Sequence, residues 1–214
     1  MTELPYNPLD KANLAASVAE ALLLRPVKPL KDLPVFDGAG IYAIYYTGSF
    51  NSYARISERN RNQLFQWPIY VGKAVPAGAR KALSNPLAGR WLHARLREHL
   101  ESIQATKNLE VDCFFCRYLI LDDIWIPLGE SLLIGIFSPV WNRSIDGFGN
   151  HDPGAGRYQG LRPRWDVLHP GRAWAEKCKA RAETAETIST EIETRLRTTT
   201  PPAFRISSLE QPPD

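Results

Sequence analysis

Two short runs of aromatic and β-branched residues constrain the fold of this chain more than any other feature. They are Gly40–Tyr46 (GIYAIYY) and Trp67–Gly72 (WPIYVG), and each is typical of a β-strand. The turn Asp37–Gly40 precedes the first run, and a long polar stretch separates the two runs. We therefore expect a strand, a long loop and a second strand.

Apolar spacing predicts helices on both sides of these strands. Leu92, Leu96, Leu100 and Ile103, for example, form one apolar stripe at helical spacing. A further strand is expected around Cys113, loops rich in Gly, Pro and Arg after residue 142, and a frayed C-terminal tail. The expected helices cover residues 8–24, 87–102, 129–137 and 173–197.

The composition suits one domain of ordinary size. The chain has 214 residues, of which 44% are hydrophobic, enough for a core. It has no run of about 18 apolar residues, and its first residues lack the basic-then-apolar order of a signal peptide. We therefore expect a cytoplasmic protein with no membrane partner.

Three cysteines, Cys113, Cys116 and Cys178, are too few for a disulfide framework. The spacing of Cys113 and Cys116 is that of half a zinc site. However, no second pair follows, and side chains three apart on a strand point to opposite faces. We interpret these residues as core cysteines.

Positive charge is concentrated in one part of the chain. Between Asn51 and Lys107 there are ten Lys and Arg residues against three Glu, although the net charge is only +3. Such a block is typical of a surface that binds a polyanion, because each cation that meets a phosphate releases counterions. A solvated face of helix and loop is the alternative.

Glu130 stands out because it is expected on the apolar face of its helix. Leu133, Ile134 and Phe137 follow it at helical spacing. A buried carboxylate is costly unless it binds a cation or strong donors, so Glu130 is a candidate metal ligand. The alternative is a partly hydrated position near the helix start, where it complements the helix dipole.

Arg95 and His99 form a second unusual pair, because they are four residues apart and share one helix face. Each directly precedes an apolar residue of the buried stripe, Leu96 or Leu100. They can therefore reach over a cleft floored by the sheet, or lie on the surface with their polar ends in water.

The ordered set of these residues resembles the GIY-YIG nuclease superfamily. Its elements are Gly40-Ile41-Tyr42, Tyr70-Val71-Gly72, Arg95 with His99, Glu130 and Asn142. The resemblance covers residues 38–143 and implies an α+β fold, with a small three-stranded antiparallel or mixed sheet flanked by helices. We accordingly expect a helical extension (1–37), the core (38–143), and a C-terminal loop, helix and tail (144–214).

The resemblance implies that two residues act on a phosphodiester. Glu130 is the expected ligand of one divalent cation, normally Mg²⁺, and Arg95 is the expected phosphate-stabilising arginine. Attack on phosphorus builds negative charge on the oxygen atoms, so a cation and a guanidinium beside them lower the barrier.

The resemblance also places Tyr42 and Tyr70 as a pair in the site. It makes Asn142 a supporting residue, and His99 a group that orients a tyrosine or assists proton transfer. A free tyrosine is a poor base at neutral pH because its pKa is about 10, but the charge of Lys73 can favour its phenolate. We expect Tyr42 to be the general base, with His99 or Tyr70 as alternatives.

Two stretches are candidates for contacts with DNA. Thr47–Pro68 and Phe148–Arg172 both carry side chains that can hydrogen-bond to base edges, and loops packed by Trp165 and Trp174 are the alternative. The candidate residues are Arg55, Arg59, Arg61, Arg157, Arg162 and Arg164, with Asn60, Gln63 and His151 beside them.

The chain resembles the type II restriction endonucleases of the superfamily in its size. We therefore expect an enzyme that cuts double-stranded DNA. One core cuts one strand, so we expect a homodimer on a short GC-rich palindrome. A monomer that cuts the strands in sequence is the alternative. Two other functions remain open: a structure-specific or mobile-element nuclease, and a non-catalytic DNA-binding module.

Overall fold

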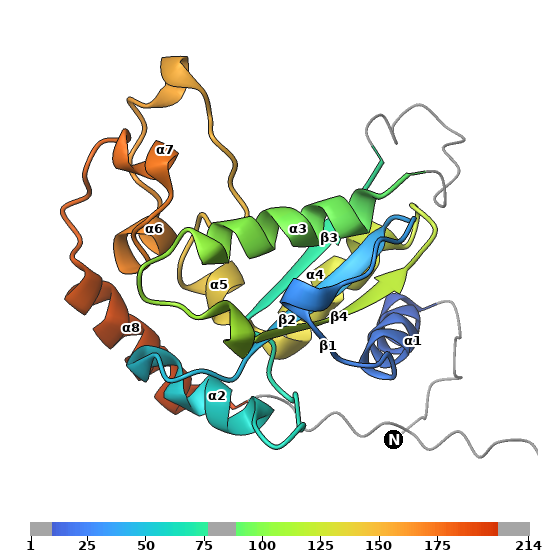
Figure 1. Ribbon diagram of the computed structural model, residues 1–214. Helices are drawn as coiled ribbons and strands as arrows, with labels where there is room; N and C mark the ends of the chain where they lie inside the picture. The colour runs from blue at the N-terminus through green and yellow to red at the C-terminus, as the bar shows by residue number, and fades with distance from the viewer. Residues whose placement is uncertain (1–9, 77–88, 201–214) are drawn as a thin grey trace, which may run out of the picture.

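The computed structural model describes residues 10–76 and 89–200. It has an α+β fold, in which helices cover both faces of a four-stranded antiparallel sheet of order β1-β4-β2-β3 (Figure 1). The strands are β1 (Lys28–Pro29), β2 (Gly40–Tyr46), β3 (Tyr70–Ala74) and β4 (Phe114–Ile120). The expected fold class is confirmed, with one strand more than predicted.

The additional strand, β1, is too short for a sequence pattern to reveal. It has two residues, and Lys28 pairs with Cys116 and Pro29 with Phe115 of β4. Because proline lacks an N–H group, it is tolerated at a sheet edge, where β1 lies. The pairing adds the segment after the first helix to the sheet.

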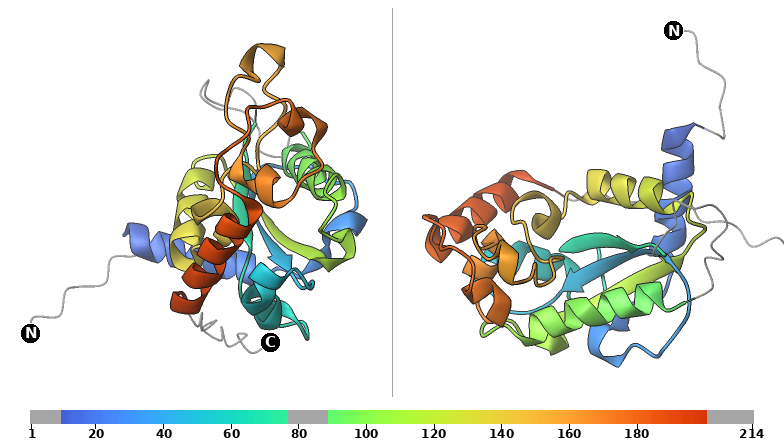
Figure 2. Two further views of the ribbon diagram at one scale, coloured as in Figure 1. Left: turned by 90° about the vertical axis from the view of Figure 1, so that its left-hand side faces the viewer. Right: turned by 90° about the horizontal axis from the view of Figure 1, so that it is seen from above.

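The central strand β2 is buried along its whole length because both of its faces are covered. Successive side chains of a strand point to opposite faces. Tyr42 therefore lies in the apolar cluster packed by α3 (Trp91–Gln104), and Ile41 in the cluster packed by α1 (Lys11–Leu23) and α4 (Ile126–Phe137). Figure 2 shows α3 and α4 on opposite faces of the sheet.

The helices expected over 8–24, 87–102 and 129–137 correspond to α1, α3 and α4 with shifted ends. Residues 8–9 and 87–88, and the predicted tail beyond residue 200, lie outside the described residues. Within the described ranges, every helix is too short or too polar to cross a bilayer. The remaining helical elements are η1 (Leu30–Asp32), η2 (Asn51–Tyr53), α2 (Ala54–Asn60), η4 (Val111–Cys113), α5 (Val140–Arg143), η5 (Ala155–Arg157), α6 (Arg164–Leu168), α7 (Ala173–Glu176) and α8 (Ala185–Thr198).

The prediction of one helix over residues 173–197 is wrong, because α7 and α8 are separate. Lys179, between them, forms a β-bridge with Leu161, and its carbonyl accepts from the Arg162 amide. A new helix then begins after Thr184, whose side chain accepts from the Thr187 amide as an N-cap. Pairing with a distant segment has overridden local helical propensity.

The stretch between β2 and β3 is not the open loop that its polarity predicts. It contains η2 and α2, and Asn60 at the end of α2 is buried. The Asn60 side chain donates to the carbonyls of Tyr46 and Trp67 and accepts from the Trp67 amide. Asn60 therefore joins two backbone segments instead of facing a nucleic acid.

The two neighbouring cysteines occupy different elements. Cys113 lies in η4, just before β4, and Cys116 is buried within β4. Burial raises the pKa of the Cys116 thiol to about 12. Over residues 10–76 and 89–200, no three His, Cys, Asp or Glu residues gather as a potential metal cluster.

Buried hydrogen bonds connect the C-terminal part of the chain to the core. Trp141 Nε1 donates to Tyr53 Oη at 2.8 Å, and Tyr53 Oη lies 2.7 Å from His169 Nε2. His169 Nδ1 lies 3.0 Å from Asn108 Oδ1, which can only accept, so His169 carries its proton on Nδ1 and accepts from Tyr53. Burial lowers the pKa of His169 to about 3.

The lowered pKa of His169 predicts that the folded protein becomes less stable in acid. The unfolded chain binds the proton near pH 6.5 and the folded chain only near pH 3, so the stabilisation is complete above pH 6.5 and is lost as the pH falls. Each unit of pKa difference corresponds to about 1.4 kcal/mol. Urea unfolding at pH 7 and pH 5 should show a smaller loss of stability in His169→Gln than in the wild type. His93→Gln is the control, because burial lowers the pKa of the partly exposed His93 far less, so this variant should lose nearly as much stability as the wild type. An equal loss in His169→Gln and the wild type would contradict the assignment.

Candidate active site

The Tyr42 phenol crosses strand β3 at Gly72, its partner in the β2–β3 register. A Cβ atom at Gly72 would lie 2.4 Å from Tyr42 Oη and 2.9 Å from Tyr70 Cε1. Only glycine leaves room for these rings, whose centroids are 6.2 Å apart. The glycine of Tyr-Val-Gly therefore allows the two tyrosines to meet at the edge of the sheet.

Gly40, the glycine of Gly-Ile-Tyr, also allows a close approach, here between the central strands β2 and β4. A Cβ atom at Gly40 would lie 2.0 Å from the carbonyl oxygen of Leu119 in β4. Gly40 thus permits the close approach of β2 and β4 at the point where β2 begins. The two motif glycines set the register that places Tyr42.

Tyr42 and His99 form a buried polar pair on the α3 face of the sheet. Tyr42 Oη lies 2.5 Å from His99 Nε2, and both side chains are fully buried. Burial raises the pKa of Tyr42 well above its ordinary value, while the nearby Arg95 opposes this shift. Burial, with the charge of Arg95, lowers the pKa of His99 well below its ordinary value. Both groups are therefore neutral at pH 7.

Arg95 lies at the margin of this pair, with its side chain only 21% exposed. Nη1 donates to Glu98 Oε2 at 2.8 Å and lies 2.6 Å from His151 Nε2, and Nη2 donates to the Gly149 carbonyl at 2.7 Å. The guanidinium is thus held in a defined orientation beside the tyrosines. Arg95 therefore reaches over the sheet instead of extending its polar end into water.

Lys73 and Glu130 approach the same edge from the other face. Lys73 is the register partner of Ile41, and its Nζ lies 2.6 Å from Oε2 of Glu130 on α4. The Glu130 side chain is 20% exposed, and its charge raises the pKa of both Tyr42 and Tyr70 beyond the effect of burial. Groups from both sides of the sheet therefore converge at β3.

The chemistry of Glu130 fits a hydrated divalent cation. Mg²⁺ usually keeps several waters and binds through one or two carboxylates together with substrate phosphates. A partly exposed carboxylate that already attracts the Lys73 ammonium meets that requirement. Glu130 of α4 would supply the acidic ligand, and the remaining ligands would be water and phosphate oxygens.

Asn142 supports the edge strand. Its Oδ1 accepts from the Val71 amide and its Nδ2 donates to the Val71 carbonyl, both at 2.8 Å. These bonds replace the neighbouring strand that β3 lacks on this side. Asn142 thereby holds the backbone between Tyr70 and Gly72 in place.

Sequence reasoning missed part of the site, a segment we call the strap, residues Gly147–His151. The Phe148 ring stacks on His99, with centroids 4.5 Å apart and planes at 15°, and meets Tyr70 edge-on at 4.9 Å. A Cβ atom at Gly149 would lie 2.9 Å from Arg95 Nη2 and 3.0 Å from Tyr70 Oη. The only signal in the sequence was the Gly-Phe-Gly run, typical of a close backbone approach.

Most of the arginines considered for DNA contacts bond within the chain. Arg55 donates to the Leu196 carbonyl, Arg61 to those of Thr47 and Gly48, Arg162 to those of Ala175 and Glu176, and Arg164 to that of Ser144 and to Glu191, with Glu183 in an ion pair. The side chains of Arg59 and Arg157 make no such contact with other described residues. Arg157 lies in a projecting segment that we call the arm, residues 152–163. Arg59 lies in α2, at the opposite end of the molecule (Figure 1, Figure 2).

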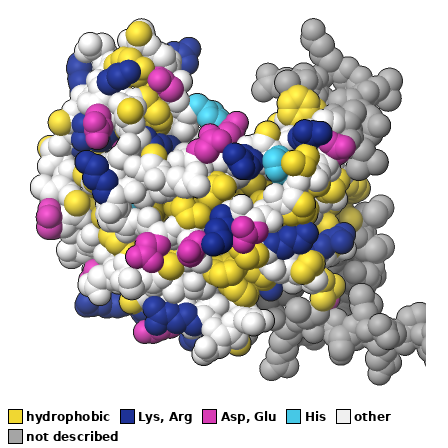
Figure 3. Space-filling view, in the orientation of Figure 1, with side chains coloured by type: hydrophobic (Ala, Val, Ile, Leu, Met, Phe, Trp, Pro, Cys, Tyr) yellow, Lys and Arg dark blue, Asp and Glu magenta, His cyan; other side chains and the backbone are white. Residues whose placement is uncertain are grey.

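The surface beside the arm is hollowed. Figure 3 shows Lys or Arg, Asp or Glu, and His side chains gathered there. A cleft of about 470 Å³ continues from the strap, with Asn150, His151, Arg157 and Trp174 among its lining residues. The cleft therefore joins the strap to the arm.

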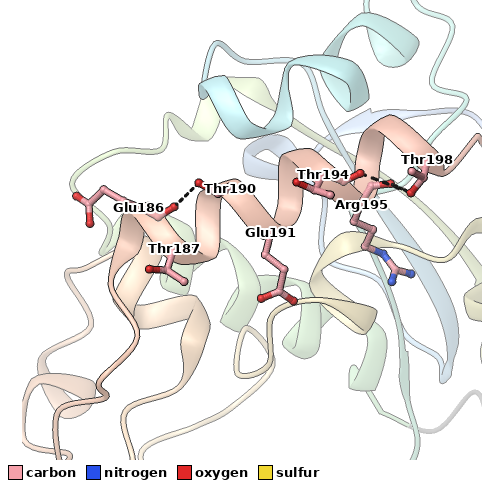
Figure 4. A pocket seen from close by; sticks show the side chains of 7 residues that line it. All are labelled: Glu186, Thr187, Thr190, Glu191, Thr194, Arg195 and Thr198. Carbon is pink, nitrogen blue, oxygen red and sulfur yellow. Dashed lines mark hydrogen bonds between the residues drawn. The ribbon is translucent and has the colours of Figure 1, made fainter.

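A second depression, of about 770 Å³, lies along α8 (Figure 4). Thr190 Oγ1 donates to the Glu186 carbonyl, and Thr198 Oγ1 to the carbonyls of Thr194 and Arg195. Because these hydroxyl groups are satisfied by the helix itself, they do not indicate a ligand.

An arginine and a carboxylate beside paired phenols are suited to the hydrolysis of a phosphodiester, and on this sheet they define a nuclease of the GIY-YIG class. The family model described as the Eco29kI GIY-YIG domain matches residues 34–196. The chain therefore belongs to the Eco29kI GIY-YIG family, which confirms the resemblance expected from its motifs. No match was found among the curated proteins.

The crossing at Gly72 predicts the effect of a single methyl group. Gly72→Ala should displace the tyrosine rings and lower the rate of DNA cleavage about 100-fold or more, since a displacement of about 1 Å can have that effect. Gly135→Ala in α4 is the matched control, because its Cβ meets nothing within 4 Å. Cleavage rates and thermal midpoints of both variants should be compared. Unchanged cleavage by Gly72→Ala would contradict the proposed crossing.

Proposed function

We propose that this protein is a type II restriction endonuclease, which cuts double-stranded DNA at a defined sequence with one divalent cation, normally Mg²⁺. The observation that carries the proposal is the convergence of Arg95, Glu130 and the Tyr42–His99 pair at the β3 edge. The match to the Eco29kI domain, with its restriction-enzyme name, supports it.

In this proposal Arg95 and Glu130 act on the phosphate. Arg95 contacts the non-bridging oxygens, where negative charge grows during attack. Its present partner Glu98 is 43% exposed, so it can move into water when a phosphate arrives. Glu130 holds the cation, which supplies further charge stabilisation and lowers the pKa of bound water.

Tyr42 is the general base of this proposal. Because burial makes a free phenolate costly, Tyr42 passes its own proton to His99 Nε2, at 2.5 Å, as it takes one from the attacking water. The lowered pKa of His99 keeps that proton transfer transient. Tyr42, unlike Tyr70, is hydrogen-bonded to a histidine nitrogen in the described structure, which favours it over Tyr70.

This assignment predicts the behaviour of Tyr42→Phe. The variant should bind duplex DNA like the wild type but cleave it about 100-fold more slowly or worse, as expected for loss of a general base. Glu130→Gln should lose cleavage in the same way. Single-turnover rates in Mg²⁺ and binding measured with chelator separate the two steps. Cleavage retained by Tyr42→Phe excludes the base assignment, and full activity of Glu130→Gln excludes the metal role.

Arg157 is the best placed of the candidate arginines to contact DNA, because its side chain has no partner among the described residues and lines the same cleft as the strap. Arg157→Ala should weaken binding to all duplex sequences and lower the slope of log affinity against log salt by about 1, with little change in stability. Arg162→Ala, which loses bonds to two carbonyls, should mainly lower the thermal midpoint. An unchanged salt slope in Arg157→Ala would remove Arg157 from the interface.

Double-strand cleavage by a one-site core requires two cores, so we propose a homodimer on a short GC-rich palindrome. A monomer that cuts the strands in turn would instead accumulate nicked circles at enzyme excess.

The function is tested by incubating the protein with unmethylated plasmid DNA, with Mg²⁺ or with chelator, and mapping the ends. Discrete Mg²⁺-dependent fragments that share one terminal sequence are expected. Cleavage of branched DNA alone would favour a structure-specific nuclease, and binding without cleavage would favour a DNA-binding module.

A further inference from the structure

The strap contacts three residues of the active site, His99, Tyr70 and Arg95, but belongs to no helix or strand. Phe148 stacks on His99 and Tyr70, and the Gly149 carbonyl accepts from Arg95. Something outside the site must therefore fix its backbone, because the orientation of these side chains depends on where the strap lies.

Arg172, just before α7, makes that connection. Its side chain is 4% exposed, and all five of its N–H groups have an acceptor. Nε and Nη2 donate to the two carboxylate oxygens of Asp166, at 2.6 and 2.5 Å. Nη2 also donates to the Gly147 carbonyl at 2.8 Å, and Nη1 donates to the carbonyls of Phe148 and Asn150, both at 3.1 Å.

The side chains around Arg172 hold its guanidinium in one orientation. Its central carbon lies 4.6 Å from the centroid of Trp165 and 4.7 Å from that of Trp174. Asp166, 2% exposed, supplies the opposite charge that a buried cation requires. The guanidinium is thus preorganised to hold three carbonyls of one loop.

We propose that Arg172 is a positioning residue of the active site, acting through the strap on Arg95 and His99. This inference rests on the proposed nuclease function and extends it to the C-terminal part of the chain. Lysine cannot replace arginine here, because it has three N–H groups and no planar fork to match five acceptors. The charge of Arg172 also contributes to the lowered pKa of His99, which agrees with their proximity.

The test compares Arg172→Lys with Arg181→Lys. Arg181 also forms ion pairs in the C-terminal part, with Asp146 and Glu183, but donates to no strap carbonyl. Arg172→Lys should lower the single-turnover cleavage rate about 10- to 100-fold while leaving DNA affinity in chelator nearly unchanged. Arg181→Lys should keep the wild-type rate. Equal rates in Arg172→Lys and the wild type, or equal losses in both variants, would overturn the proposal.

Phe148→Leu gives a second test, and its single-variant comparison needs no substitution at Arg172. It removes the ring that stacks on His99 but keeps an apolar side chain, and it should also slow cleavage at unchanged affinity. If both residues act through the strap, the double variant should lose less activity than the two single losses combined. Unchanged cleavage in Phe148→Leu, or additive losses, would overturn the proposal.

An NMR measurement separates this inference from the nuclease function. The ring protons of His99 feel the ring current of Phe148, so their chemical shifts should move in Arg172→Lys and stay in Arg181→Lys. This comparison needs no DNA. If the wild type cuts no DNA and the His99 shifts still move in this way, the nuclease proposal fails and the coupling stands. Unchanged His99 shifts in a folded Arg172→Lys would overturn the coupling.

Discussion

The close crossing of the Tyr42 phenol over Gly72 is the contact on which the rest of the site depends. It requires β2 and β3 to pair in one register, so that a residue without a side chain lies opposite Tyr42. Given that register, Tyr42 Oη reaches His99 on α3. Asn142 secures the same strand from outside, through both polar groups of Val71. A shift by one residue would turn every side chain of β3 to the other face and dismantle the site.

The resting site balances its own charges. Arg95 is paired with Glu98, Lys73 with Glu130, and the tyrosine and histidine between them are neutral because they are buried. Each pair has one partly exposed member, Glu98 at 43% and Lys73 at 38%, so separating either pair costs little stability. A phosphate can replace Glu98 as the partner of Arg95, and a divalent cation can replace Lys73 as the partner of Glu130. In the proposed function, substrate binding therefore exchanges internal ion pairs for the contacts that stabilise the transition state.

The elements that could be predicted are those encoded by local spacing. β2, β3, α3 and α4 follow from short apolar patterns, and the ordered motif residues identified the family. The two-residue β1, the break between α7 and α8, and the strap depend on contacts between distant segments, which no local pattern shows. The role of a charged residue was similarly ambiguous, because Arg157 and Arg172 look alike in the sequence. Arg157 is exposed, and its side chain has no partner within residues 10–76 and 89–200, whereas Arg172 is buried with five acceptors.

The central claim is that the groups at the β3 edge form one phosphodiester-cleaving site. It is tested most directly by a crystal structure of the protein with a duplex containing its mapped cleavage sequence and Ca²⁺ in place of Mg²⁺. The predicted result is the cut phosphate on Arg95 and one cation at about 2.3–2.6 Å from a Glu130 oxygen. DNA bound on another face, with Arg95 still on Glu98 and Glu130 still on Lys73, would contradict it.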